Sequence, residues 1–79
     1  MNNFEIYKDC FKSSLSISDE GLEKLEYNSI PEWDSIGHMT LISELEEKFE
    51  ISIETDDIVA FSSFSIGKEI LQKYKVEFK

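Results

Sequence analysis

Ser35 is the side chain best placed to do chemistry, because it follows Asp34 at the predicted start of a helix. Asp34 is a typical helix N-cap, whose carboxylate accepts backbone N–H bonds and opposes the helix dipole. The Ser35 hydroxyl is then expected to face solvent beside N–H groups that attract an anion. A catalytic serine also needs a base, a third group and an oxyanion hole. The only histidine, His38, is predicted to point toward the core, so we do not expect an enzyme.

The other reactive side chains indicate structure rather than a metal or redox site. Cys10 is the only cysteine, so it cannot form an internal disulfide, and one cysteine with one histidine cannot build a zinc site. We expect Cys10 to be a small buried hydrophobe. The acids Glu54, Asp56 and Asp57 can attract a divalent cation, but such clusters are more typical of charge at a helix start. No metal site is therefore predicted.

The charge balance narrows the class of partner. The 79 residues, expected to form one domain over 1–79, include 17 acids, 8 lysines and no arginine, for a net charge of −9. Nucleic acids and anionic membrane surfaces both require a basic face. No apolar run is longer than Ile58–Phe61, so no membrane span is expected. We expect a monomer in the reducing cytoplasm whose partners are basic protein surfaces.

Apolar residues at three- and four-residue spacing predict four helices that position Ser35. They are expected at residues 3–14, 35–50 and 55–61, with a fourth that begins at Ser63 or Ser65. Signals for strands and hairpins are weak. The sequence therefore predicts an all-α fold, with its third helix much shorter than its second.

A long connection over 15–34 precedes the helix of Ser35. Connections of this length are usually functional or pinned by apolar anchors, and a short helical turn is expected near 20–25. Trp33, at the end of the connection, is predicted to cover the core beside Ser35. A brief extended stretch is expected at Ile51–Ile53.

The predicted second helix has two apolar features. Ile36 lies nearly opposite the core face, with Met39 at the flank and carboxylates following along the helix. An exposed apolar spot with an acidic margin is typical of a docking surface, although single exposed apolar residues are common. The core face itself is expected to consist of His38, Leu41, Ile42, Leu45 and Phe49.

Two segments of the sequence indicate that Ser35 is more than part of a helix cap. The sequence reads Glu-Trp-Asp-Ser-Ile-Gly-His-Met over Glu32–Met39 and Leu-Glu-Glu-Lys-Phe-Glu-Ile over Leu45–Ile51. Asp-Ser taken alone is an ordinary cap. Together with the length, the acidity, the four predicted helices and the long first loop, these residues resemble the acyl carrier protein family, in which Asp-Ser-Leu is the signature. Ile36 is a conservative variant of its third residue. The resemblance covers nearly the whole chain and implies a small irregular four-helix bundle.

The resemblance also implies a function. Ser35, within a motif that includes Asp34, would carry 4′-phosphopantetheine, installed from coenzyme A by a phosphopantetheinyl transferase. The thiol of that arm would hold acyl groups as thioesters for loading, condensing or acyl-transfer enzymes with basic docking patches. The residues expected to contact these partners are Ile36, Met39, Glu46, Glu47 and Glu50. The residues expected to line an acyl cavity are Ile42, Leu45, Phe49, Ile53, Ile58 and Phe61.

The cargo stays open at this point. Gly37 and Thr40 stand where many relatives carry acids, and Lys48 interrupts the acidic run. These departures resemble carriers of specialised pathways, so fatty-acid, polyketide and related biosynthesis are all considered. An aminoacyl or peptidyl carrier is an alternative, although the Gly-Gly-His-Ser type of motif is missing. The outside alternative is a non-covalent acidic adaptor that binds a basic protein.

Overall fold

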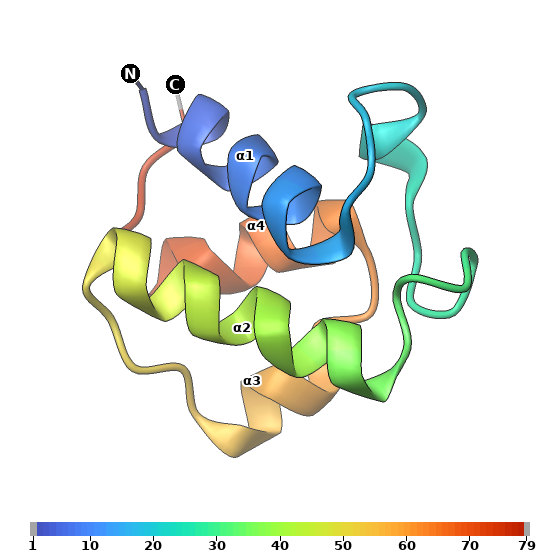
Figure 1. Cartoon of the computed structure of the whole chain (residues 1–79). Coiled ribbons are helices and arrows are strands. Elements are labelled where there is room, and N and C mark those ends of the chain that lie inside the picture. The colour runs from blue at the N-terminus through green and yellow to red at the C-terminus, as the bar shows by residue number, and fades with distance from the viewer. Residues whose placement is uncertain (1, 79) are drawn as a thin grey trace.

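Four α-helices make up the framework of the computed structural model, which describes residues 2–78 (Figure 1). They are α1 (Asn3–Leu15), α2 (Ser35–Phe49), α3 (Thr55–Ala60) and α4 (Phe64–Lys73), with a 3₁₀ turn at Leu22–Lys24. Over residues 2–78 the only β pairing is an isolated bridge between Glu26 and Ser63. The all-α prediction is confirmed, and so are the short third helix and the long first connection.

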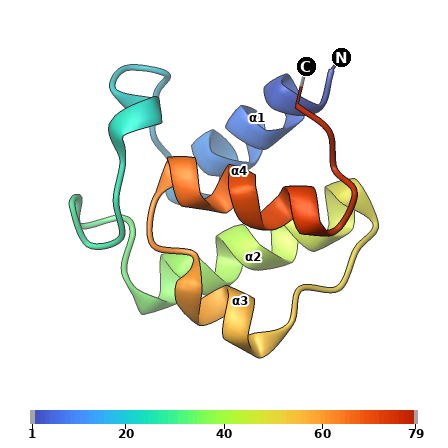
Figure 2. The ribbon, with the colours of Figure 1, turned by 180° about the vertical axis from the view of Figure 1, so that it is seen from behind.

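The helices follow one another back and forth across the molecule. α1 and α2 run side by side in opposite directions, and α4 lies behind them in Figure 1 and in front in Figure 2. The short α3 sits below α2 and leads directly into α4. The first and last described residues lie close together (Figure 1). This arrangement places the start of α2 between the long first connection and α3.

Aromatic rings fill much of the core. Trp33 and Phe11 are completely buried, and their ring centroids are 5.3 Å apart in an edge-on arrangement. Phe64 lies 5.0 Å from Phe11, and the Tyr7 hydroxyl donates to the Phe64 carbonyl at 2.6 Å. Aromatic pairs at such distances stabilise a core beyond the area they bury. A chain of this size therefore uses a few large side chains to exclude water.

Helix caps explain most of the element boundaries. The Asp34 carboxylate accepts the Gly37 N–H at 2.9 Å, which confirms the predicted cap of α2. Of the two serines considered for α4, Ser63 is the cap, because its hydroxyl accepts the Ile66 N–H at 3.0 Å. α3 begins at Thr55 after Glu54, whose side chain makes no capping bond. Its six residues depend instead on contacts with neighbouring elements.

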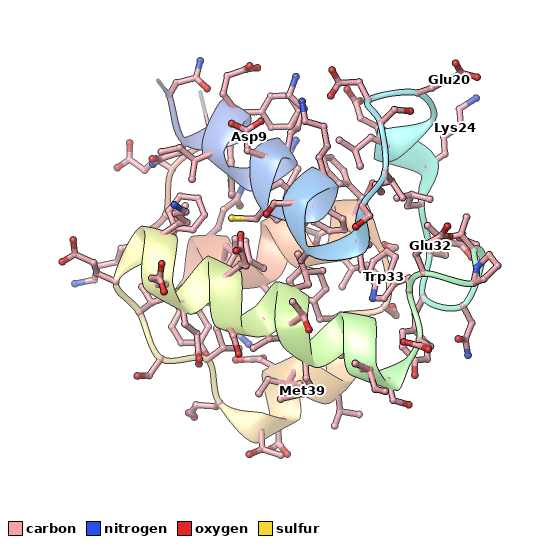
Figure 3. The ribbon with its side chains drawn as sticks, viewed as in Figure 1. Asp9, Glu20, Lys24, Glu32, Trp33 and Met39 are labelled. Atoms are coloured by element: carbon pink, nitrogen blue, oxygen red, sulfur yellow. The ribbon has the colours of Figure 1, made fainter. Side chains whose placement is uncertain are left out.

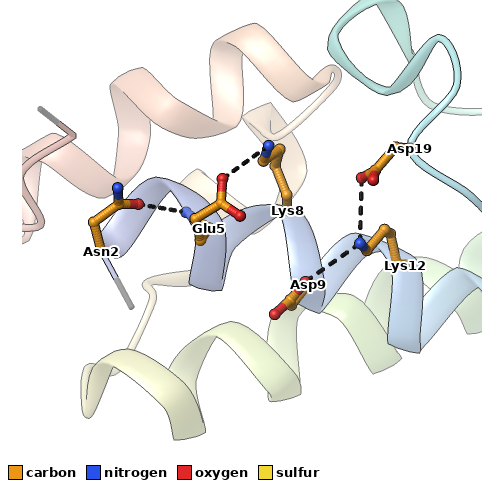
Figure 4. A network of polar contacts seen from close by, with 6 residues as sticks. All are labelled: Asn2, Glu5, Lys8, Asp9, Lys12 and Asp19. Carbon is orange, nitrogen blue, oxygen red and sulfur yellow. Dashed lines mark hydrogen bonds and ion pairs between the residues drawn. The ribbon is translucent and has the colours of Figure 1, made fainter.

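The long first connection is pinned rather than loose. Leu22 is buried, and the Leu25 carbonyl accepts the Phe64 N–H at 3.0 Å. The Tyr27 N–H donates to the Ser62 carbonyl at 2.9 Å. At its other end, Lys12 of α1 lies 3.2 Å from Asp19 and 3.5 Å from Asp9 (Figure 4). The connection is therefore tied to the start of α4, to the segment just before it and to α1.

The second helix buries three of the five residues of the predicted face and partly buries the other two. Leu41, Ile42 and Leu45 are buried, and Phe49 is partly buried against them. His38, expected on the same face, is also only partly buried and lies at its edge. Within residues 2–78 no helix is both long and apolar enough to cross a membrane.

Candidate functional site around Ser35

Ser35 is the first residue of α2, and its side chain is exposed. The preceding Asp34 is extended, with φ −107° and ψ −166°, and its carbonyl accepts the His38 N–H at 2.7 Å. The first N–H groups of a helix have no carbonyl partner within that helix and carry partial positive charge. The Ser35 oxygen thus lies in solvent at an end of a helix that favours an anion.

Tyr27 is a neighbour of Ser35 that the sequence did not reveal. Its hydroxyl lies 3.4 Å from the Ser35 oxygen, although Tyr27 is eight positions earlier in the chain. The Tyr27 ring meets the His38 ring edge-on at 5.3 Å and the Trp33 ring at 6.3 Å. The backbone bond from Tyr27 to Ser62 holds the residue in place. Nothing in the periodicity around Tyr27 could have indicated this approach.

Tight backbone packing fixes the segment that leads into α2. The Trp33 carbonyl accepts the Asn28 N–H at 3.0 Å, and the Ile30 carbonyl accepts the Trp33 N–H at 3.2 Å. Gly37 lies so close to the Glu32 carbonyl that a Cβ there would overlap it. Trp33 itself is fully buried. It is therefore part of the core beneath the site, and not a cover on the surface of that core as predicted.

A chain of hydrogen bonds links the segment before α2 to α3 through His38. The Trp33 indole N–H donates to His38 Nδ1 at 2.9 Å, so Nδ1 is an acceptor and the ring proton resides on Nε2. Nε2 then donates to the Ile58 carbonyl at 2.8 Å. Both ring nitrogens are thereby engaged away from Ser35. His38 is a structural connector between α2 and α3, not a base for the serine.

A mostly apolar pocket of about 270 Å³ opens beside the serine. His38 and Tyr27 form two of its walls, and Tyr27 also contacts Ser35. The remaining lining is supplied by α3 and the residues after it: Ile58, Val59, Phe61 and Ser62.

The predicted cavity residues separate into two groups. Ile58 and Phe61 line this pocket. Ile42, Leu45 and Ile53 are buried in the core, and Phe49 is partly buried against it. The pocket lining includes none of these four. Their assignment to an acyl cavity stays a prediction.

The predicted partner surface is exposed around its apolar part. Ile36 is 79% exposed and Met39 50%, with Met39 on the side of α2 toward α3 in Figure 3. Val59 of α3, which the sequence reasoning missed, is also 79% exposed. The spacing of residues did not single out Val59, and only the three-dimensional placement of α3 reveals its exposure.

The three predicted docking acids differ in their surroundings. Glu47 and Glu50 are exposed. Glu46 is partly buried, and its carboxylate accepts the Ile53 N–H at 2.8 Å. Glu46 therefore holds the segment between α2 and α3, a role that spacing along a helix cannot reveal.

The other singled-out residues form no metal site within the described chain. Among residues 2–78, no group of three or more His, Cys, Asp or Glu side chains is placed to hold a metal ion. Asp57 accepts from Lys73 at 2.6 Å and from Tyr74 at 2.5 Å, which lowers the pKa of its carboxyl group. Cys10 is buried, as predicted, and burial raises the pKa of its thiol to about 12. At that pKa the thiol is not a reactive nucleophile.

Comparisons with known proteins leave the chain without an assigned relative. No protein-family model, curated protein or solved structure matches it. Any assignment of function therefore depends on the residues around Ser35.

Proposed function

We propose that this protein is a carrier whose Ser35 hydroxyl is the attachment point for 4′-phosphopantetheine. The observation that supports this most directly is the exposed serine at the first position of α2, next to the capping Asp34. The helix N–H groups favour the phosphodiester that attachment would create. The Tyr27 hydroxyl, 3.4 Å away, is a further donor beside it. The residues present therefore suit the group.

Attachment is a phosphoryl transfer that another enzyme would catalyse. The Ser35 oxygen would form a bond to the phosphorus of coenzyme A that bears the pantetheine. The pyrophosphate bond would break, and the adenosine bisphosphate half would leave. The serine proton would pass to a base on the transferase, since both nitrogens of His38 are engaged by Trp33 and Ile58. Once attached, the arm supplies a thiol that holds acyl groups as thioesters.

Partner enzymes would dock on the surface around the attachment point. Ile36, Met39 and Val59 are exposed apolar residues on α2 and α3. Glu47 and Glu50 add exposed negative charge farther along α2. A basic patch with an apolar centre on the partner would complement this surface. The net charge of −9 would speed encounters with such a patch.

Intact-mass measurement tests the proposal. The chain is incubated with coenzyme A and several broad-specificity phosphopantetheinyl transferases. We expect wild type to gain one phosphopantetheine and Ser35→Ala to gain none. Ser43→Ala is the matched control, because Ser43 is an exposed serine on the same helix. A wild-type chain that stays unmodified by every transferase would contradict the proposal and favour a non-covalent acidic adaptor.

If the chain is modified, its pathway can then be assigned from the group that is loaded on the thiol. Fatty-acid, polyketide and aminoacyl carriers use the same arm and differ in what is loaded on its thiol. Incubating the modified protein with acyl-transfer enzymes and with aminoacyl-activating enzymes distinguishes these classes by the added mass.

A further inference from the structure

The pocket beside Ser35 is closed on its inner side by aromatic rings. Phe61 is 1% exposed, and its ring lies 5.8 Å from His38 and 6.4 Å from Trp33. Phe11 lies behind, 6.2 Å from Phe61 and 5.3 Å from Trp33. A group that enters from the Ser35 side therefore meets a wall of rings before it reaches the core.

Directional bonds hold this wall in place. Trp33 donates to His38, and His38 donates to the Ile58 carbonyl, so the wall joins the start of α2 to α3. Opening it would leave the Trp33 N–H without its partner and the Ile58 carbonyl with only the Phe61 N–H at 3.4 Å, which is costly in a partly buried site. A purely apolar wall would part without that cost.

The volume of the pocket also limits the size of the group that it can hold. Its volume of about 270 Å³ lies just below the range of about 300–1,000 Å³ that is usual for small-molecule sites. The buried Ile42 and Leu45, which would have to line a deeper cavity, are outside its lining. The available space suits a short apolar group.

We infer, on the basis of the proposed carrier function, that the pocket shelters only a short acyl group and that His38 blocks longer chains. His38 is then a specificity-determining residue, because it fixes the wall between α2 and α3. A butyryl group would lie against Ile58 and Phe61. A decanoyl chain would remain largely in water.

Melting temperatures of loaded proteins test this inference. Wild type is loaded at Ser35 by a phosphopantetheinyl transferase from coenzyme A, butyryl coenzyme A or decanoyl coenzyme A. Burial of a tethered group stabilises the folded state, so butyryl should raise Tm by roughly 5 °C over the unacylated form. Decanoyl should raise it by no more than butyryl does. A clearly larger rise with decanoyl, or no rise with butyryl, would overturn the inference.

His38→Ala tests the role of the histidine. Removal of the ring opens the wall, so the decanoyl form should gain Tm over the unacylated variant and exceed the butyryl form. Thr40→Ala, an exposed change on the same helix, should keep the wild-type order. If His38→Ala does not fold, Phe61→Leu tests the wall of rings instead, because it removes an aromatic ring while an apolar side chain and both bonds of His38 are retained. A variant that folds and keeps the wild-type order would remove His38 or Phe61 from this role.

Thioester cleavage by hydroxylamine gives a second readout that wild type alone can supply. Each carrier-bound thioester is compared with the same acyl group on free pantetheine. We expect butyryl to be protected roughly tenfold more than decanoyl, because only a sheltered thioester is hidden from the reagent. Equal protection of both chains would contradict the inference. Failure of loading, seen by intact mass, would instead contradict the proposed carrier function, so the two failures are distinguishable.

Discussion

At the scale of single residues, the start of α2 combines exposure with a tightly determined backbone. The Ser35 hydroxyl is exposed, while Asp34 and Gly37 immediately around it are fixed by a capping bond. Glu32 approaches Gly37 from the preceding segment. An attachment serine benefits from this combination, because a partner enzyme meets a preformed target and pays little ordering entropy.

Gly37 provides a test of that tight approach. Glycine to alanine inside a helix normally stabilises by up to about 1 kcal/mol. Here the added methyl group would meet the Glu32 carbonyl and contact Leu15 at 3.0 Å, so we expect Gly37→Ala to lower the free energy of unfolding. Thr40→Ala, an exposed change one turn later, should be neutral or slightly stabilising. Chemical denaturation of both variants measures the difference, and a stabilised Gly37→Ala would show that the approach is looser.

At the scale of elements, α2 is the helix on which both the core and the site depend. Its inner face buries Leu41, Ile42 and Leu45, and its N-terminus carries Ser35. Loss of core packing under α2 would therefore affect the position of the serine as well as stability.

Leu45→Ala measures what the inner face contributes. Leu45 is completely buried, and removal of such a side chain costs about 2–5 kcal/mol in transfer and cavity terms. Because small domains have little stability to spare, this variant is expected to be largely unfolded or close to it. Met39→Ala is the control on the same helix, since Met39 is half exposed. A normal melting curve for Leu45→Ala would mean that the face is misassigned.

The contact between Asp57 of α3 and the C-terminal end of α4 predicts that stability depends on pH. The pKa of Asp57 is lowered mainly by the hydrogen bond from Lys73, and to a smaller extent by the hydrogen bond from Tyr74. A carboxyl group with a lower pKa in the folded state stabilises the fold above its unfolded pKa of about 3.9. That contribution is lost as pH falls through the folded pKa.

Asp57→Asn tests this linkage through melting temperature. At neutral pH wild type should melt above Asp57→Asn. The difference should shrink as the pH falls below 4 and through the lowered folded pKa of Asp57, because the carboxyl group then becomes protonated and both side chains are uncharged. High salt should also reduce the difference, because the Lys73 side chain is largely exposed. A difference that is constant from neutral to acidic pH would show that the bond to Lys73 contributes no charge-dependent stability.

At the scale of the whole molecule, regular features were predictable and irregular contacts were not. The spacing of Leu41, Ile42 and Leu45 revealed the buried face, because a helix repeats every 3.6 residues. The cap at Asp34 followed from its residue type alone. These predictions depend on neighbours in sequence, so the sequence was sufficient for them.

The irregular contacts join residues on different elements or loops, at separations that no helical repeat relates. The approach of Tyr27 to Ser35 and the bond from His38 to Ile58 both depend on how the first connection and α3 settle against α2. Glu46 was predicted as a docking acid, yet its bond to Ile53 was hidden for the same reason. The exposed serine at the start of α2 could thus be predicted from the sequence, whereas the wall of the pocket beside it could not.

The overall acidity predicts how fast a partner finds the site. Glu47→Lys places a positive charge on the exposed side of α2, so transfer of phosphopantetheine to Ser35 should slow by roughly tenfold at low salt. Added salt should shrink that difference, because it screens exposed charges. Stability should change little, since Glu47 is exposed.

Glu20→Lys is the control for that reversal, because it makes the same change in net charge at another exposed position. Glu20 lies in the loop after α1, well away from Met39 in Figure 3. If only net charge steers the partner, both variants should slow transfer equally. If the α2 surface docks the partner, Glu47→Lys should slow it more, by a margin that disappears at high salt. Equal rates for wild type and Glu47→Lys at low salt would remove the docking role of this surface.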